Sequence, residues 1–120
     1  MIVFARVCIA LFAALLLNDA HAQEPARLSG SYWIGGRTLV DAPPDELKNT
    51  HLYVVLEGAS ARDTYRAMSV RARRDACLDD GSMTKTIGAM QCTELAKAKG
   101  YRCAFSVNLA DQKIDGGAAC

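Results

Sequence analysis

The fold is decided by one stretch of sequence, Tyr101-Arg102-Cys103-Ala104-Phe105-Ser106-Val107-Asn108-Leu109. Apolar side chains occupy its odd-numbered positions, and smaller or polar side chains occupy the positions between them. This period of two is typical of a β-strand that turns one face toward a core. Residues 101–109 therefore predict a strand whose core face includes Cys103.

A second strand-like run, Met83 to Cys92, precedes this strand, and residues 93–100 join the two. If Cys92 lies opposite Cys103 in an antiparallel hairpin, the apolar positions of both strands fall on the same face. That register also pairs Met90 with Phe105 and Gly88 with Val107. Because register and polarity agree, the sequence predicts a Cys92–Cys103 disulfide that closes the hairpin.

The first 22 residues have the organisation of a cleaved export signal. Arg6 precedes an apolar run over residues 7–17, and Ala20-His21-Ala22 matches a signal-peptidase site. The run is shorter than the roughly 20 residues that span a bilayer, which disfavours a permanent membrane helix. We therefore expect a periplasmic or secreted chain with no stable membrane anchor. Cleavage would also remove Cys8, one of the five cysteines.

An even set of cysteines in a short exported chain predicts two disulfides. With Cys92 joined to Cys103, the remaining bond links Cys77 to Cys120, the last residue. Chain-entropy reasoning assigns about 3 kcal/mol to the shorter closure and about 4 kcal/mol to the longer one. A domain of this size has a modest core, so these bonds are expected to supply a large share of its stability.

Residues 23–50 are expected to form a polar lead and loop region, in which Pro43 and Pro44 interrupt any strand. Residues 31–40 favour a small hairpin or a strap around Gly35-Gly36. The disulfide-stapled core is then residues 51–120.

The core begins with the continuous apolar run His51 to Leu56, which predicts a central strand buried on both faces. The sequence Ser60-Ala61-Arg62-Asp63 resembles a capping box, so a helix is expected to begin near Ala61. Helical spacing places Ala61, Tyr65, Met68 and Ala72 on one side and Arg62, Arg66 and Arg73 on another. With a short terminal strand around Ile114, the predicted fold is α+β, a small single domain with one helix packed on a short, mainly antiparallel sheet.

The sequence contains no strong catalytic or cofactor motif, and we expect no cofactor and no metal. His51 is the one histidine after cleavage, and without a nucleophile motif beside it a structural role is favoured. The cysteine spacings lack C-x-x-C and the paired knuckles of zinc sites. Asp75, Asp79 and Asp80 do not have EF-hand spacing and are expected to cap backbone amides in a turn.

Two surfaces are candidates for contact with a protein partner. The first combines the helix arginines, Arg62, Arg66 and Arg73, with the loop that holds Asp79 and Asp80, although runs of charge usually face water. The second is Trp33, beside the Gly-Gly turn. Nucleic acid is disfavoured, because 14 basic residues nearly balance 13 acidic ones and no aromatic residues interleave with the arginines.

The function favoured by the sequence is that of a small exported, non-enzymatic binding protein. A rigid stapled surface suits an inhibitor or immunity protein that acts on an envelope-targeted enzyme. Two other functions stay open at this point: an envelope hydrolase or accessory enzyme that uses His51, and a structural component of the envelope.

Overall fold

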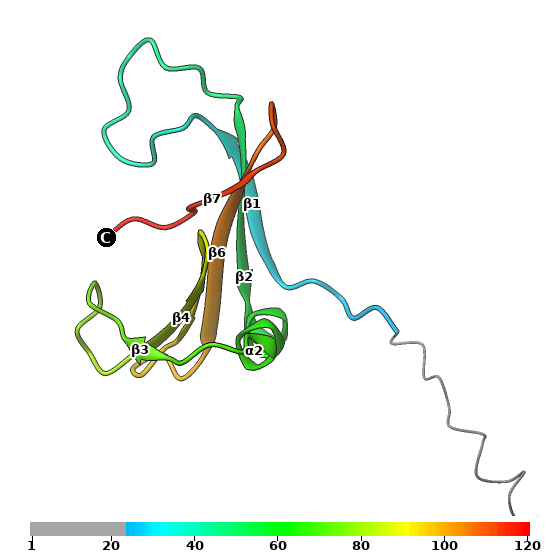
Figure 1. Cartoon of the computed structure of the whole chain (residues 1–120), viewed down its shortest axis with the longest axis vertical. Helices are drawn as coiled ribbons and strands as arrows, with labels where there is room; N and C mark the ends of the chain where they lie inside the picture. The colour runs from blue at the N-terminus through cyan, green and yellow to red at the C-terminus, as the bar shows by residue number, and fades with distance from the viewer. Residues whose placement is uncertain (1–23) are drawn as a thin grey trace, which may run out of the picture.

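A computed structural model describes residues 24–120, and the predicted export signal lies outside them. The described chain forms one helix and one antiparallel sheet of seven strands (Figure 1). In chain order the elements are β1 (Gly30–Gly35), β2 (His51–Glu57), α2 (Gly58–Ala67), β3 (Arg73–Arg74), β4 (Met83–Ile87), β5 (Met90–Glu94), β6 (Tyr101–Asn108) and β7 (Ile114–Asp115). The sheet order is β1-β2-β6-β5-β4-β3, and β7 pairs with β6. The predicted α+β class is confirmed.

Both predicted disulfides are present, Cys77–Cys120 and Cys92–Cys103. Cys92 lies directly opposite Cys103 in the β5–β6 ladder, as the hairpin register predicts, and both residues are fully buried. Disulfides are compatible with an exported protein. Among residues 24–120, no helix has the length and apolar character needed to cross a membrane.

The run Met83 to Cys92 was expected to be one strand, and that prediction is wrong. The chain reverses at Gly88 and Ala89, so β4 and β5 pair with each other through Ile87 and Met90. Gly88 has a φ of 56°, a left-handed conformation that glycine adopts at little steric cost. Gly88 therefore lies in the turn instead of opposite Val107, and the β5–β6 ladder ends at Gln91 and Ala104.

The expected capping box is also wrong. Helix α2 begins directly after β2, where Gly58 at φ 54° turns the chain from strand to helix. The Ser60 hydroxyl instead accepts a hydrogen bond of 2.7 Å from the Ser29 amide, and Asp63 accepts from its neighbour Arg62. Ser60 thereby ties the segment before β1 to the helix.

The helix ends at Ala67, because Met68 has an extended backbone. Arg73 was expected on the helix, but it lies in β3, where it pairs with Thr84 of β4. Two of the predicted apolar positions, Ala61 and Tyr65, are buried on the helix itself. They pack with Met68, Leu56 and the Cys92–Cys103 disulfide to form the core.

The sheet extends into the region expected to be lead and loop. Gly30–Gly35 is the edge strand β1, which pairs with β2 instead of forming a hairpin of its own. Strand β2 was expected at the centre of the sheet; it is an interior strand, between the edge strand β1 and β6. It is not buried on both faces along its whole length, since Leu52 and Val54 remain half-exposed.

Candidate functional site

The helix covers only one end of the sheet. Figure 1 shows α2 nearly end-on, across the strands beside the start of β6. A helix is about 10–12 Å wide, whereas an eight-residue strand such as β6 is about 26 Å long. A helix lying across such strands leaves roughly half of their length uncovered.

Burial changes along the strands at the edge of the helix. Leu56 and Cys103 lie under α2 and are buried. Leu52 on β2 and Val107 on β6 point to the same side of the sheet, beyond the helix, and are only half-buried. The sheet therefore presents apolar side chains that its own helix does not cover.

We call this surface the open apolar face. The strand register assembles it as the row Ile34, Leu52, Val107 and Ile114. The next row, Tyr32, Val54 and Phe105, joins it to the core, because Val54 and Phe105 are half-buried and pack against the cluster under the helix. Tyr32 is 74% exposed, Ile34 49% and Ile114 51%. A contiguous apolar patch at a protein surface is a candidate interaction surface.

An apolar groove of ≈ 380 Å³ adjoins the open apolar face at the edge strand. It is lined by Leu28, Gly30, Ser31, Tyr32, Leu52 and Val54. Gly30 contributes no side chain, and a Cβ at this position would collide with the Val55 carbonyl oxygen. Glycine is therefore required at position 30 for the close pairing of β1 with β2.

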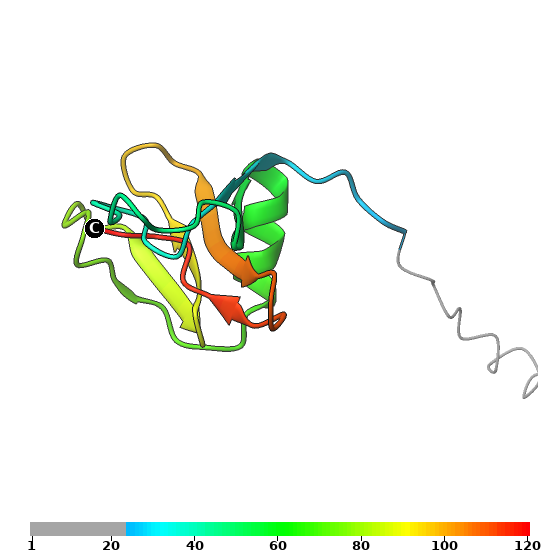
Figure 2. The ribbon, with the colours of Figure 1, turned by 90° about the horizontal axis from the view of Figure 1, so that it is seen from above.

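The opposite face of the sheet is covered by the loop over residues 36–50 and by the C-terminal segment (Figures 1 and 2). Tyr53 is buried there, stacks on Trp33 with ring centres 5.0 Å apart, and donates a hydrogen bond of 2.6 Å to the Gly36 carbonyl. Burial, followed by the charges of Glu46 and Asp115, raises the pKa of the Tyr53 hydroxyl. Trp33 thus covers the buried Tyr53 ring at the edge of a small second core, and the Trp33 residue itself remains 41% exposed.

His51 lies on this same face and is 4% exposed. Its Nδ1 atom is 2.8 Å from the Thr50 hydroxyl, and its Nε2 atom is 3.1 Å from an Asp115 carboxylate oxygen. A polar pocket of ≈ 450 Å³ beside it is lined by Arg37, His51, Ser106, Asn108, Asp111, Lys113, Asp115 and Gly116. A hydroxyl, an imidazole and a carboxylate in series can activate a nucleophile. Thr50, however, does not line the pocket, so the arrangement mainly fastens β7 to β2.

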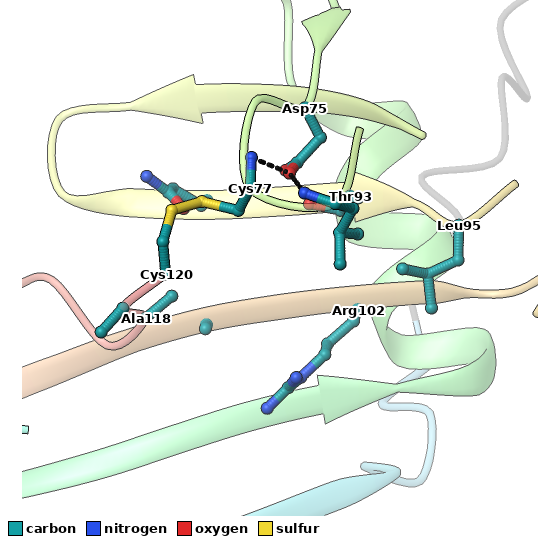
Figure 3. Close-up of a pocket in the computed structure, with 11 residues that line it drawn as sticks. Asp75, Cys77, Thr93, Leu95, Arg102, Ala118 and Cys120 are labelled. Carbon is teal, nitrogen blue, oxygen red and sulfur yellow. Dashed lines mark hydrogen bonds between the residues drawn. A yellow bond between two sulfur atoms is a disulfide. The ribbon is translucent and has the colours of Figure 1, made fainter. Parts of the chain in front are cut away.

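A third hollow lies beside the Cys77–Cys120 disulfide (Figure 3). Its volume is ≈ 260 Å³, and its floor includes Thr93 of β5 and Arg102 of β6. Asp75 orders the wall, since one of its oxygens accepts from the Cys77 and Leu78 amides and the other accepts from the Thr84 hydroxyl. The disulfide anchors the C-terminal segment across this hollow.

The residues predicted for partner contact do not form one site. Arg62 and Arg66 are on α2, where Arg62 forms an exposed ion pair with Asp63. Arg73 is on β3 at one edge of the sheet, and Trp33 is on β1 at the other edge. Asp79 and Asp80 lie in the loop before β4, where Asp79 pairs with Arg74 and Asp80 caps the Ser82 amide. Their contact with a partner stays a prediction.

Sequence reasoning missed the open apolar face. A continuous apolar run such as residues 51–56 predicts burial on both faces, and it does not show how much of one face a helix will cover. The available signal was that a single helix is predicted beside strands that are longer than a helix is wide. In the described part of the chain, no cluster of three or more His, Cys, Asp or Glu side chains is arranged to hold a metal ion.

No protein-family model, curated protein or solved structure matches this chain.

Proposed function

We propose that the mature chain is an exported, non-enzymatic binding protein that inhibits or neutralises an envelope-targeted enzyme, with the open apolar face as its contact surface. The observation that carries the proposal is the row Ile34, Leu52, Val107 and Ile114, which the register aligns across four strands. Ile34 and Ile114 in it are exposed, and Leu52 and Val107 are half-buried. An apolar centre with a polar rim is the usual anatomy of a protein interface.

The scaffold supports this function. A buried disulfide holds β5 and β6 under the helix, and the second disulfide fixes the C-terminal segment. A surface held rigid before contact loses little conformational entropy on binding, which favours affinity. The partner that fits this surface is a protein with a complementary apolar, uncharged patch.

The test uses the disulfide-bonded mature chain immobilised against an envelope extract. We expect the wild type to retain an enzyme whose activity falls when free protein is added. Ile114→Lys places a charge in the row and should abolish both retention and inhibition. Leu109→Lys is a matched control, because Leu109 is 49% exposed in the turn after β6, and it should behave as the wild type.

A third variant, Arg62→Ala/Arg66→Ala, tests the surface predicted from sequence. If this variant fails to retain the enzyme while Ile114→Lys still retains it, the contact surface is the helix arginines and not the open apolar face. Retention of an enzyme that keeps full activity would argue against an inhibitory role.

The hydrogen-bonded pair His51 and Asp115 lines the polar pocket and supports a second candidate function, an envelope hydrolase. Its test is turnover of peptidoglycan or glycan substrates by the wild type. Activity lost in His51→Ala and in Asp115→Asn, with both variants folded, would favour an enzyme. Absence of turnover in the wild type would remove this candidate.

A further inference from the structure

The two edges of the sheet differ in how well they are protected against pairing with another strand. Strand β3 has two residues, both arginine, and charge on a short edge strand discourages further pairing. Strand β1 has six residues, Gly-Ser-Tyr-Trp-Ile-Gly, with no charge and no proline, and its register with β2 is unbroken. An exposed, uncharged edge strand of this length is a template for another strand.

The hydrogen bonds identify which backbone groups of β1 face outward. The carbonyls of Ser29 and Gly35 accept from Glu57 and Thr50, so the odd-numbered residues turn their polar groups toward β2. Because inward and outward groups alternate along a strand, the amide and carbonyl of Tyr32 face the open edge. The same alternation applies to Ile34.

We propose that β1 pairs antiparallel with β1 of a second copy of this chain, about a two-fold axis at Tyr32. In this register the two Tyr32 residues exchange both backbone hydrogen bonds, which is the pattern of a closely bonded antiparallel pair. The pairing is isologous, because each copy uses the same surface.

The side chains of β1 are self-complementary in this register on both faces of the sheet. Ile34 of one copy lies opposite Gly30 of the other, which has no side chain and lines the apolar groove. On the opposite face, Trp33 lies across from the small Ser31. The two exposed Tyr32 rings lie opposite each other, and cross-strand aromatic pairs stabilise a sheet. A large residue meets a small one at each flanking position.

Charge also permits this association. The strand carries no charged residue, and basic and acidic residues nearly balance in the whole chain. Two copies therefore do not repel each other strongly. A two-fold axis perpendicular to the sheet leaves both helices on one side, so the two open apolar faces would form one longer surface. This inference goes beyond the proposed function and does not depend on it.

The experiment measures the mass of the disulfide-bonded mature protein in solution by sedimentation or light scattering. The wild type is expected to be a dimer. Tyr32→Lys and Tyr32→Glu each place like charges opposite one another and should give monomers. An equimolar mixture of the two variants should restore the dimer, because opposite charges then face each other across the axis.

Ile34→Lys provides a second disruption that removes the residue opposite Gly30, and it should also lower the dimer fraction. Its control is Leu78→Lys, because Leu78 and Ile34 are both 49% exposed and Leu78 lies far from β1 in the chain. The control should remain a dimer. A monomeric wild type would overturn the proposal. Dimers that persist in the single Tyr32 variants, or a mixture that stays monomeric, would overturn the proposed register.

Discussion

Lys85 Nζ donates a hydrogen bond of 3.0 Å to the main-chain carbonyl of Tyr65 and lies 4.5 Å from the centre of the Tyr65 ring. The same amine donates to the Met68 carbonyl at 3.1 Å. The last carbonyls of a helix lack partners within the helix, and a cation there interacts favourably with the helix dipole. A side chain of β4 therefore stabilises the end of α2.

Replacing this lysine should destabilise the fold. Lys85→Met keeps most of the side-chain stem and removes the charged donor, so we expect the free energy of unfolding to fall by about 1–3 kcal/mol. Urea unfolding followed by circular dichroism measures the change. Lys97→Met, at an exposed position, should stay within about 0.5 kcal/mol of the wild type. Equal effects at both positions would contradict the role of Lys85.

Part of the fold could be predicted from local sequence pattern, and part depended on contacts between distant segments. The strand over residues 101–108 and the placement of Cys92 opposite Cys103 follow from local pattern, and both are correct. The alternation did not predict that Ala104 and Ser106, on the other face of this strand, are buried as well. The turn at Gly88 and the early helix start at Gly58 depend on single glycines with positive φ, whose neighbours also suit a continuous strand or a later helix. Where the chain turns at Gly88 and where the helix starts at Gly58 depend on the strand pairing of the folded sheet, which the local sequence does not show.

The two disulfides should differ in their resistance to reduction. Cys92 and Cys103 are fully buried in the core, whereas Cys77 and Cys120 are exposed. Thiol exchange requires access of the attacking thiolate, so mild reductant should open Cys77–Cys120 first. Alkylation followed by peptide mapping checks the order, and early labelling of Cys92 or Cys103 in folded protein would contradict it. Loss of the outer bond should cost up to about 4 kcal/mol of stability.

Acid should weaken the loop that Asp75 orders. The Thr84 hydroxyl, and then the Leu78 and Cys77 amides, hold the pKa of Asp75 below its ordinary value of 3.8. A lowered pKa in the folded state stabilises the protein above the unfolded value, and this contribution is lost as the pH falls through the folded value. The difference in free energy of unfolding between the wild type and Asp75→Asn should therefore become smaller below about pH 4.

Urea midpoints measured for both proteins across this range test the prediction. Asp45→Asn, in the exposed loop over residues 36–50, is the control and should follow the wild type at every pH. A constant difference between the wild type and Asp75→Asn from neutral to acid pH would show that ionisation of Asp75 is not the cause.

The candidate site was less predictable than the fold. The arginines at positions 62, 66 and 73 share a helical period in the sequence, but the chain leaves the helix at Met68 and carries Arg73 to the far edge of the sheet. Conversely, Ile34, Leu52, Val107 and Ile114 are far apart in sequence and meet only through three strand pairings. Side chains that gather through long-range register leave no local pattern.

Gly117 determines how closely the C-terminal segment can approach the sheet. A Cβ at this position would lie 2.5 Å from the Phe105 carbonyl carbon and 2.6 Å from its nitrogen and oxygen, all of them backbone atoms of β6 that cannot easily move. Gly117→Ala should therefore lift the segment and cost about 1–3 kcal/mol of stability, as overpacking typically does. Its neighbour is a matched control, because a Cβ on Gly116 would meet no atom within 4 Å. Gly116→Ala should be nearly neutral in urea unfolding. Faster reduction of Cys77–Cys120 in Gly117→Ala alone would show that this close approach holds the outer disulfide in place, and equal reduction rates in the two variants would show that it does not.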